Sequence, residues 1–131
     1  MHPGRSTPPP TPDGHATAYG ALLGGLGVAL GAFGAHTLRE QVTPAMLEVF
    51  ETGVKYQMFH AAALLALGAH RGQRRAPAWL LAGTLVFSFS LYALVLTGAR
   101  WLGAVTPIGG ALMIIGWFVV FIDARRLAAT R

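Results

Sequence analysis

The sequence predicts an all-α fold, a four-helix transmembrane bundle with a short amphipathic interfacial helix between its first and second spans. Hydrophobic residues make up 53% of the 131 positions and charged residues only 11%, whereas charged residues form roughly 25% of a typical soluble domain. Such a chain lacks the polar groups needed to cover a water-soluble globule. Charged residues also separate long uncharged runs, and about 20 apolar residues are enough to cross a bilayer core. These runs lie at 14–38, 56–70, 76–99 and 101–122.

The first 16 residues are expected to form a disordered tail. They hold five of the eight prolines and almost no apolar side chains, so ordering them would bury too little surface to offset the lost entropy. A cleaved signal peptide is the alternative, because Arg5 precedes an apolar stretch, but that stretch is longer than the apolar region of a signal. The rest forms one domain over 17–127, with spans at about 17–38, 52–70, 76–98 and 101–122, and a short tail at 128–131.

The second run reaches spanning length only if it begins near Thr52, with Lys55 extending its ammonium to the headgroups. Before it, Thr43 and Pro44 form an N-cap and first-turn signature, and apolar side chains follow at helical spacing. We expect an amphipathic helix there. It either lies on the membrane surface or leads straight into the second span, with Gly53 available as a bend.

The distribution of Lys and Arg predicts the orientation, because these residues concentrate on the cytoplasmic side of membrane proteins. With four crossings, seven of the ten basic residues fall on the side of both termini and three on the other side. Both termini are therefore expected in the cytoplasm. The basic residues are scattered in ones and threes, so the net charge of +5 indicates orientation and not nucleic-acid binding.

Glycines recur along one face of the first span. Their mean spacing of 3.5 residues keeps a seam toward one neighbouring helix, and small residues let helices in lipid approach closely. The partner is either another span of the same chain or a second copy, so a homo-oligomer or larger complex stays open. The stripe consists of Gly20, Gly24, Gly27, Gly31 and Gly34, and the last span has a similar face at Gly103 and Gly110.

Pro107 interrupts the last span, within the string TPIGG. It either kinks a helix that begins near Trp101, or lies in the first turn of a helix that Thr106 caps and that runs to about Leu127. The second arrangement leaves 101–105 as a short interfacial segment. We favour the kink.

Polar side chains inside the spans gather toward the outer half of the bilayer. Ionisable groups in lipid are functional candidates by default, and His60 is the deepest of them, with a side chain that can change charge near neutral pH. Together these groups either line a pocket open to the outside, or bond one another and hold the helices in register. The candidate pocket consists of His36, Tyr56, His60, Ser88, Tyr92 and Thr106.

The spans lack the residue sets that most enzymes and metal proteins need. Ser88 and Ser90 lie in FSFSLY without a nucleophile elbow, and no carboxylate occurs inside a span. Only two histidines, at different depths, are available to a metal or a haem. Asp123 lies at the cytoplasmic end, whereas proton-coupled exporters usually place a carboxylate at the midplane. We expect no catalytic residue, metal or cofactor.

Four strings in this order resemble those of small bacterial inner-membrane proteins: GAFGAHTL, TGVKYQMFH, FSFSLY and TPIGG. This is the family of domain of unknown function 423, also called uncharacterised protein family 0382, related to eukaryotic transmembrane protein 256. The resemblance covers about 17–122 and implies a four-helix inner-membrane protein without an established activity, substrate or cofactor. One departure is Phe89, where members commonly have glycine. The residues on family motifs are His36, Tyr56, His60, Tyr92, Thr106, Pro107 and Gly109.

The expected function is that of a non-enzymatic structural or accessory component of the inner membrane, with the lipid bilayer as its surroundings. The alternative is a membrane protein that handles a small molecule or protons through an outer-leaflet polar pocket around His60.

Overall fold

The computed structural model describes residues 12–70 and 72–130, which form four long helices and two short 3₁₀ helices and contain no strand. The all-α, four-helix prediction is therefore confirmed. The long helices are α1 (Gly14–His36), α2 (Pro44–Ala69), α3 (Ala76–Thr97) and α4 (Thr106–Ala129), and the 3₁₀ helices are η1 (Leu38–Glu40) and η2 (Arg100–Ala104).

The chain begins α1 earlier than expected. Asp13 is the N-cap, and its carboxylate accepts hydrogen bonds from the backbone amides of His15 and Ala16 at 3.1 and 3.2 Å. This cap starts the helix at Gly14, three residues before the expected position. Most of the predicted disordered tail, 1–11, lies outside the described residues.

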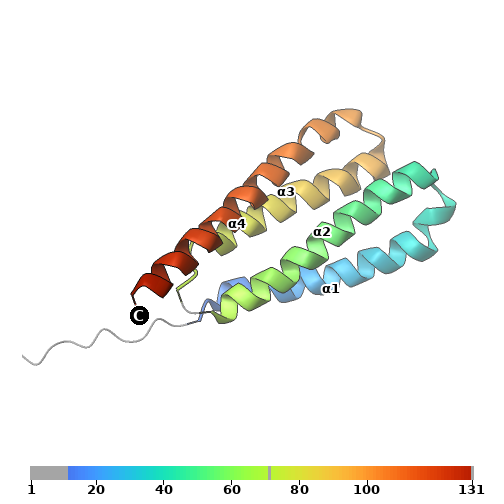
Figure 1. The fold of residues 1–131 in the computed structure, drawn as a ribbon. Helices are drawn as coiled ribbons and strands as arrows, with labels where there is room; N and C mark the ends of the chain where they lie inside the picture. The colour runs from blue at the N-terminus through green and yellow to red at the C-terminus, as the bar shows by residue number, and fades with distance from the viewer. Residues whose placement is uncertain (1–11, 71, 131) are drawn as a thin grey trace, which may run out of the picture.

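The helices form two antiparallel hairpins that lie side by side (Figure 1). In the first hairpin α1 packs on α2, in the second α3 packs on α4, and α2 and α3 join the two. Within the described residues the backbones of α2 and α4 do not approach each other. Contacts between these two helices therefore depend on side chains alone.

Three helical segments are long and apolar enough to cross a membrane: Gly14–Glu40, Ala76–Thr97 and Arg100–Ala129. α2 has sufficient length, but its first half carries Glu48, Glu51 and Lys55. A crossing by the second predicted span stays a prediction.

The amphipathic segment before the second span is the beginning of α2. The Thr43 hydroxyl accepts a hydrogen bond from the Met46 amide at 3.3 Å, and Pro44 lies in the first turn. The helix then continues to Ala69. The segment is therefore continuous with the residues predicted to form the second span.

The last helix begins at Thr106, with Pro107 in its first turn, so the kinked helix that we favoured does not form. A proline suits the first turn because an amide there would have no partner within the helix. Thr106 does not cap the helix either. Its hydroxyl donates to the carbonyl of Leu102 at 3.3 Å and lies 2.7 Å from the hydroxyl oxygen of Ser90.

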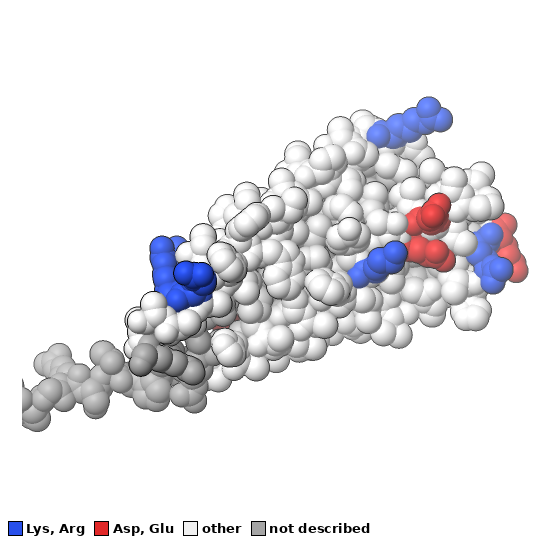
Figure 2. Space-filling model, viewed as in Figure 1, with Lys and Arg blue, Asp and Glu red and all other residues white. Residues whose placement is uncertain are grey.

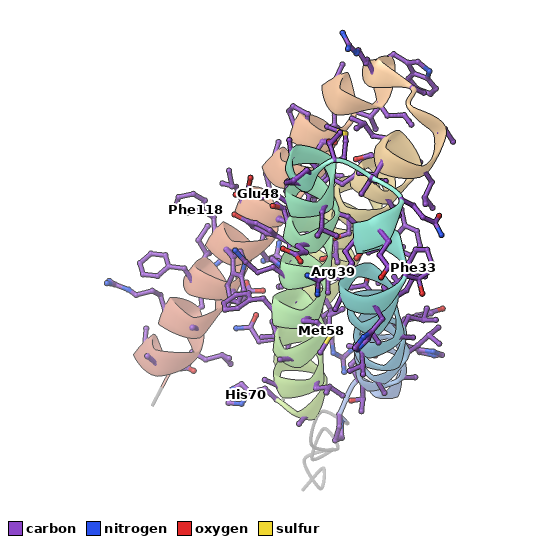
Figure 3. All side chains as sticks on the ribbon, turned by 90° about the vertical axis from the view of Figure 1, so that its right-hand side faces the viewer. Phe33, Arg39, Glu48, Met58, His70 and Phe118 are labelled. Carbon is purple, nitrogen blue, oxygen red and sulfur yellow. The ribbon has the colours of Figure 1, made fainter. Side chains whose placement is uncertain are left out.

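The glycine stripe of α1 faces α2 of the same chain. A Cβ atom on Gly20 would lie 2.9 Å from the backbone oxygen of Ala61, and one on Gly34 would lie 3.2 Å from the Phe50 ring. Figure 3 shows Met58 between the two helices. The remaining stripe residues contact the same helix: Gly24 faces Ala61, Gly27 faces Met58 and Gly31 faces Val54.

A different pair of glycines than predicted makes the tightest approach between α3 and α4. A Cβ atom on Gly109 would lie 2.7 Å from the Cα of Phe87 and 2.8 Å from the carbonyl oxygen of Gly83. One on Gly116, seven residues on, would lie 2.6 Å from the Leu80 side chain. The predicted pair makes only ordinary contacts, 3.5 Å to Leu94 for Gly103 and 3.9 Å to Phe87 for Gly110.

Replacing Gly109 with alanine should force α3 and α4 apart, because the new methyl group would meet backbone atoms that cannot move alone. We expect the free energy of unfolding to fall by about 1–3 kcal/mol, as for other overpacked sites. Gly110→Ala is the matched control and should be close to neutral. Unfolding in detergent, followed by circular dichroism, measures both, and equal midpoints would show that Gly109 does not set the helix separation.

Candidate functional site

A buried chain of hydrogen bonds links three helices near the middle of the molecule. The Tyr92 hydroxyl in α3 donates to Oε1 of Gln57 in α2 at 2.7 Å. Nε2 of Gln57 donates in turn to the carbonyl oxygen of Leu23 in α1 at 2.8 Å. Gln57 is completely buried and Tyr92 is 5% exposed. The amide of one side chain therefore ties both neighbouring helices to α2.

A second bond at the same junction joins α2 to α3. The Ser88 hydroxyl donates to the carbonyl oxygen of Gly53 at 2.8 Å. Gly53 also leaves room for an aromatic ring, since a Cβ atom there would lie 2.7 Å from Cε1 of Tyr92. Ser88 and Tyr92, one turn apart in α3, thus both depend on the absence of a side chain at Gly53.

His60 is bonded through both ring nitrogens. Its Nδ1 lies 2.7 Å from the carbonyl oxygen of Tyr56, and Nε1–H of Trp117 in α4 donates to its Nε2 at 3.1 Å. A neutral imidazole with the proton on Nδ1 satisfies both bonds. The bond to Trp117 bridges α2 and α4, and both ring nitrogens are occupied.

Of the remaining predicted pocket residues, Tyr56 stacks on the His60 ring with centroids 6.3 Å apart, whereas Thr106 and His36 lie elsewhere. Thr106 pairs with Ser90 within the second hairpin. Tyr56 packs on Phe87 with ring centroids 4.7 Å apart and is 41% exposed, and His36 is exposed at the end of α1. The structure therefore does not bring the six predicted side chains to one cavity.

A cavity of about 630 Å³ lies instead where α1 begins, beside the connection between α2 and α3. None of the six predicted pocket residues lines it; its lining includes Asp13, His15, His70 and Gln73. Within 12–70 and 72–130 no three His, Asp or Glu side chains lie close enough to hold a metal ion.

Two bonds attach the α2–α3 connection to α4 at this same end. Arg75 forms an ion pair with Asp123 at 2.8 Å, and Nε2 of Gln73 donates to the carbonyl oxygen of Val120 at 3.2 Å. Asp123, expected at the cytoplasmic end beside Arg125 and Arg126, is paired with an arginine of the loop. These two bonds hold the connection to α4, whereas the bond between Trp117 and His60 joins α4 directly to α2.

Sequence reasoning missed Gln57 and Trp117. An amide inside an apolar span is unusual enough to attract notice, and Gln57 stands between Tyr56 and His60, which were both singled out. Trp117 carries no such signal, because tryptophan in a span is commonly explained by its preference for the membrane interface.

Comparison with known proteins gives the family. The model of the family described as "Protein of unknown function (DUF423)" matches residues 30–110, which include Gln57, His60 and Tyr92. The chain belongs to this family. No solved structure matches the chain.

Two relatives of this DUF423 protein illustrate the similarity. The "UPF0382 membrane protein SAB0533" of Staphylococcus aureus (strain bovine RF122 / ET3-1) is 44% identical over 114 residues, which cover 83% of this chain and 93% of the relative. The "UPF0382 inner membrane protein YgdD" of Escherichia coli (strain K12) is 40% identical over 116 residues, 83% of this chain and 88% of the relative. The protein is thus a member of a family of membrane proteins.

Removing the Tyr92 hydroxyl should destabilise the protein because it leaves the buried Gln57 oxygen without a donor. We expect Tyr92→Phe and Gln57→Leu each to lower the free energy of unfolding by about 1–3 kcal/mol. The double variant should lose less than the sum, since both substitutions remove the same bond. Tyr56→Phe is the control, because the Tyr56 hydroxyl bonds to no other described residue. Strict additivity in detergent unfolding would argue against a coupled pair.

Proposed function

We propose that the protein is a non-enzymatic structural or accessory component of the inner membrane, in which the polar side chains serve to hold the helices together. The observation that carries this proposal is the bonded chain from Tyr92 through Gln57 to Leu23. In lipid there is little hydrophobic force between helices, so close packing and bonds between helices stabilise the fold. These polar groups form their hydrogen bonds with one another, between helices of the same chain.

His60 supports the same function. A histidine that binds a small molecule or relays protons needs a ring nitrogen in contact with that molecule, with water or with another titratable group. Both nitrogens of His60 are bonded, and the cavity beside the start of α1 is not lined by His60. The alternative, a pocket around His60, therefore requires the bond to Trp117 to open.

The names of the relatives support a place in the inner membrane. The Staphylococcus aureus relative is called a membrane protein and the Escherichia coli relative an inner membrane protein, and neither name carries an activity. We propose four crossings with both termini in the cytoplasm. α2 lies beside α1 and α3 and has 26 residues, a length of about 39 Å by the helical rise, which is sufficient to cross.

Fusions to the C-terminus test the proposed orientation. A fluorescent reporter there should be bright and an alkaline phosphatase fusion inactive, because the side with both termini carries most of the basic residues. A fusion placed after Gln41, in the connection that follows η1, should give the reverse pattern. Active phosphatase at the C-terminus would place that end outside the cytoplasm and overturn the proposed orientation.

The function itself is tested with His60→Ala in reconstituted vesicles. We expect neither the wild type nor the variant to conduct protons after a pH jump, read with a trapped pH-sensitive dye. The variant should lose about 2–4 kcal/mol of stability from the bonds and packing removed. His36→Ala, at an exposed position, should stay within about 0.5 kcal/mol of the wild type. Proton movement that depends on His60 would overturn the structural proposal in favour of the alternative.

A further inference from the structure

The outward face of α2 carries charges that form no ion pair within the described residues. Glu48, Glu51 and Lys55 are all exposed, and the ion pair formed among described residues is the one between Arg75 and Asp123. Figure 2 shows acidic and basic side chains close together toward the η1 end of the molecule, and further basic side chains at the opposite end and at the tip of the second hairpin. We call the side of α2 with these three residues the charged face.

The charged face extends to a level where the rest of the surface is apolar. Lys55 follows Val54, which packs on Gly31 of α1. The side chains that α1 exposes near that level are Val28, 63% exposed, and Phe33, 37% exposed. Charged residues at membrane depth usually pair with one another or face protein. A partner that supplies opposite charges fits this face better than lipid does.

We propose that the charged face binds a second copy of the chain, related by a two-fold axis along the membrane normal. A two-fold interface places the same patch on both sides, so the patch must be complementary to itself. Glu51 and Lys55 meet this requirement because they have opposite charges and lie one helical turn apart. With two α2 helices parallel, equivalent residues lie at the same level, and Lys55 of each copy is about 6 Å along the axis from Glu51 of the other, a distance that its long side chain spans diagonally. Glu48, a turn beyond Glu51, adds negative charge to the same side.

The other half of this face permits close approach of two helices. The exposed positions that continue it are Ala62, Ala66 and Ala69, and small side chains let helices in lipid come together. Phe59, the bulky residue of the stretch, is 63% exposed and lies on the α4 side of this face, with its ring centroid 6.0 Å from that of Trp117. This face is opposite to the side of α2 that holds Gln57, so the inference goes beyond the proposed function and does not depend on it.

Single cysteines test the interface, since the chain contains no cysteine of its own. Ala66→Cys lies on the proposed interface. Ala21→Cys is the matched control, exposed on α1 at a similar level because the neighbouring Gly20 contacts Leu65. Oxidation of full-length protein in native membranes should link Ala66→Cys into a disulfide dimer and leave Ala21→Cys monomeric. A monomeric Ala66→Cys chain, or equal dimer from both, would overturn the proposal.

Charge reversal in the Ala66→Cys background then separates pairing between copies from pairing within one helix. Lys55→Glu and Glu51→Lys each place like charges across the two-fold axis, so each alone should lose the dimer band. Co-expressed with tags of different size, the two variants should recover a mixed dimer. In both variants the two residues of one helix repel each other, so a pair within the helix cannot produce this recovery.

Three results would overturn the charged interface. One is a dimer band that neither reversal changes, and another is the absence of a mixed dimer when both variants are present in the membrane. The third is a cross-linked product at the mass of a different protein, which would assign the face to another partner. A recovered mixed dimer would show at the same time that both variants fold.

Discussion

The structure depends on one constraint: a polar group buried away from water must find its hydrogen-bond partner in the protein. Gln57 satisfies this constraint by reaching α1 and α3 at once. That reach requires helices at close range, and glycines provide it. A Cβ atom on Gly27 would lie 3.4 Å from the Gln57 amide nitrogen, and Gly53 makes room for the Tyr92 ring. Close packing at these glycines therefore brings the helices near enough for the polar side chains to bond between them.

The two hairpins differ from the junction between them. Within each hairpin, glycine against backbone or side chain brings the helices together, as with Gly20 on α2 and Gly109 on α3. Between the hairpins, the side chains of Ser88, Tyr92 and Trp117 donate hydrogen bonds to α2. Hydrophobic clusters lie on both sides of these hydrogen bonds, one around Leu64 and one around Phe50. Bonds also occur within a hairpin, as between Gln57 and Leu23, but the contact between α2 and α4 rests on side chains alone.

The sequence predicts the helical class and the approximate helix lengths because uncharged runs of spanning length have few other outcomes in lipid. It does not predict the register of close packing. A spacing of seven describes both Gly103 with Gly110 and Gly109 with Gly116, and the position of Phe87 on α3 decides which pair is tight. Pro107 is similar. A proline suits a kink or a first turn equally well, and the contact between Thr106 and Ser90 belongs to the second.

The polar residues show why spacing along a helix can be predicted while the neighbours that each side chain meets cannot. Tyr56 and His60 lie one turn apart on α2, yet Tyr56 packs on Phe87 of α3 and His60 bonds Trp117 of α4. The two rings still stack on each other, with centroids 6.3 Å apart, so the rotation of α2 about its axis decides which further helix each side chain meets. α2 is also the long helix that is not apolar enough to count as a candidate span. It supplies Gln57, Gly53 and His60 to the contacts between helices. Central position alone does not explain its polarity, because α3 also lies between two helices and is apolar enough to span. α2 differs in the exposed charges of Glu48, Glu51 and Lys55, which lie on the side of the helix away from Gln57.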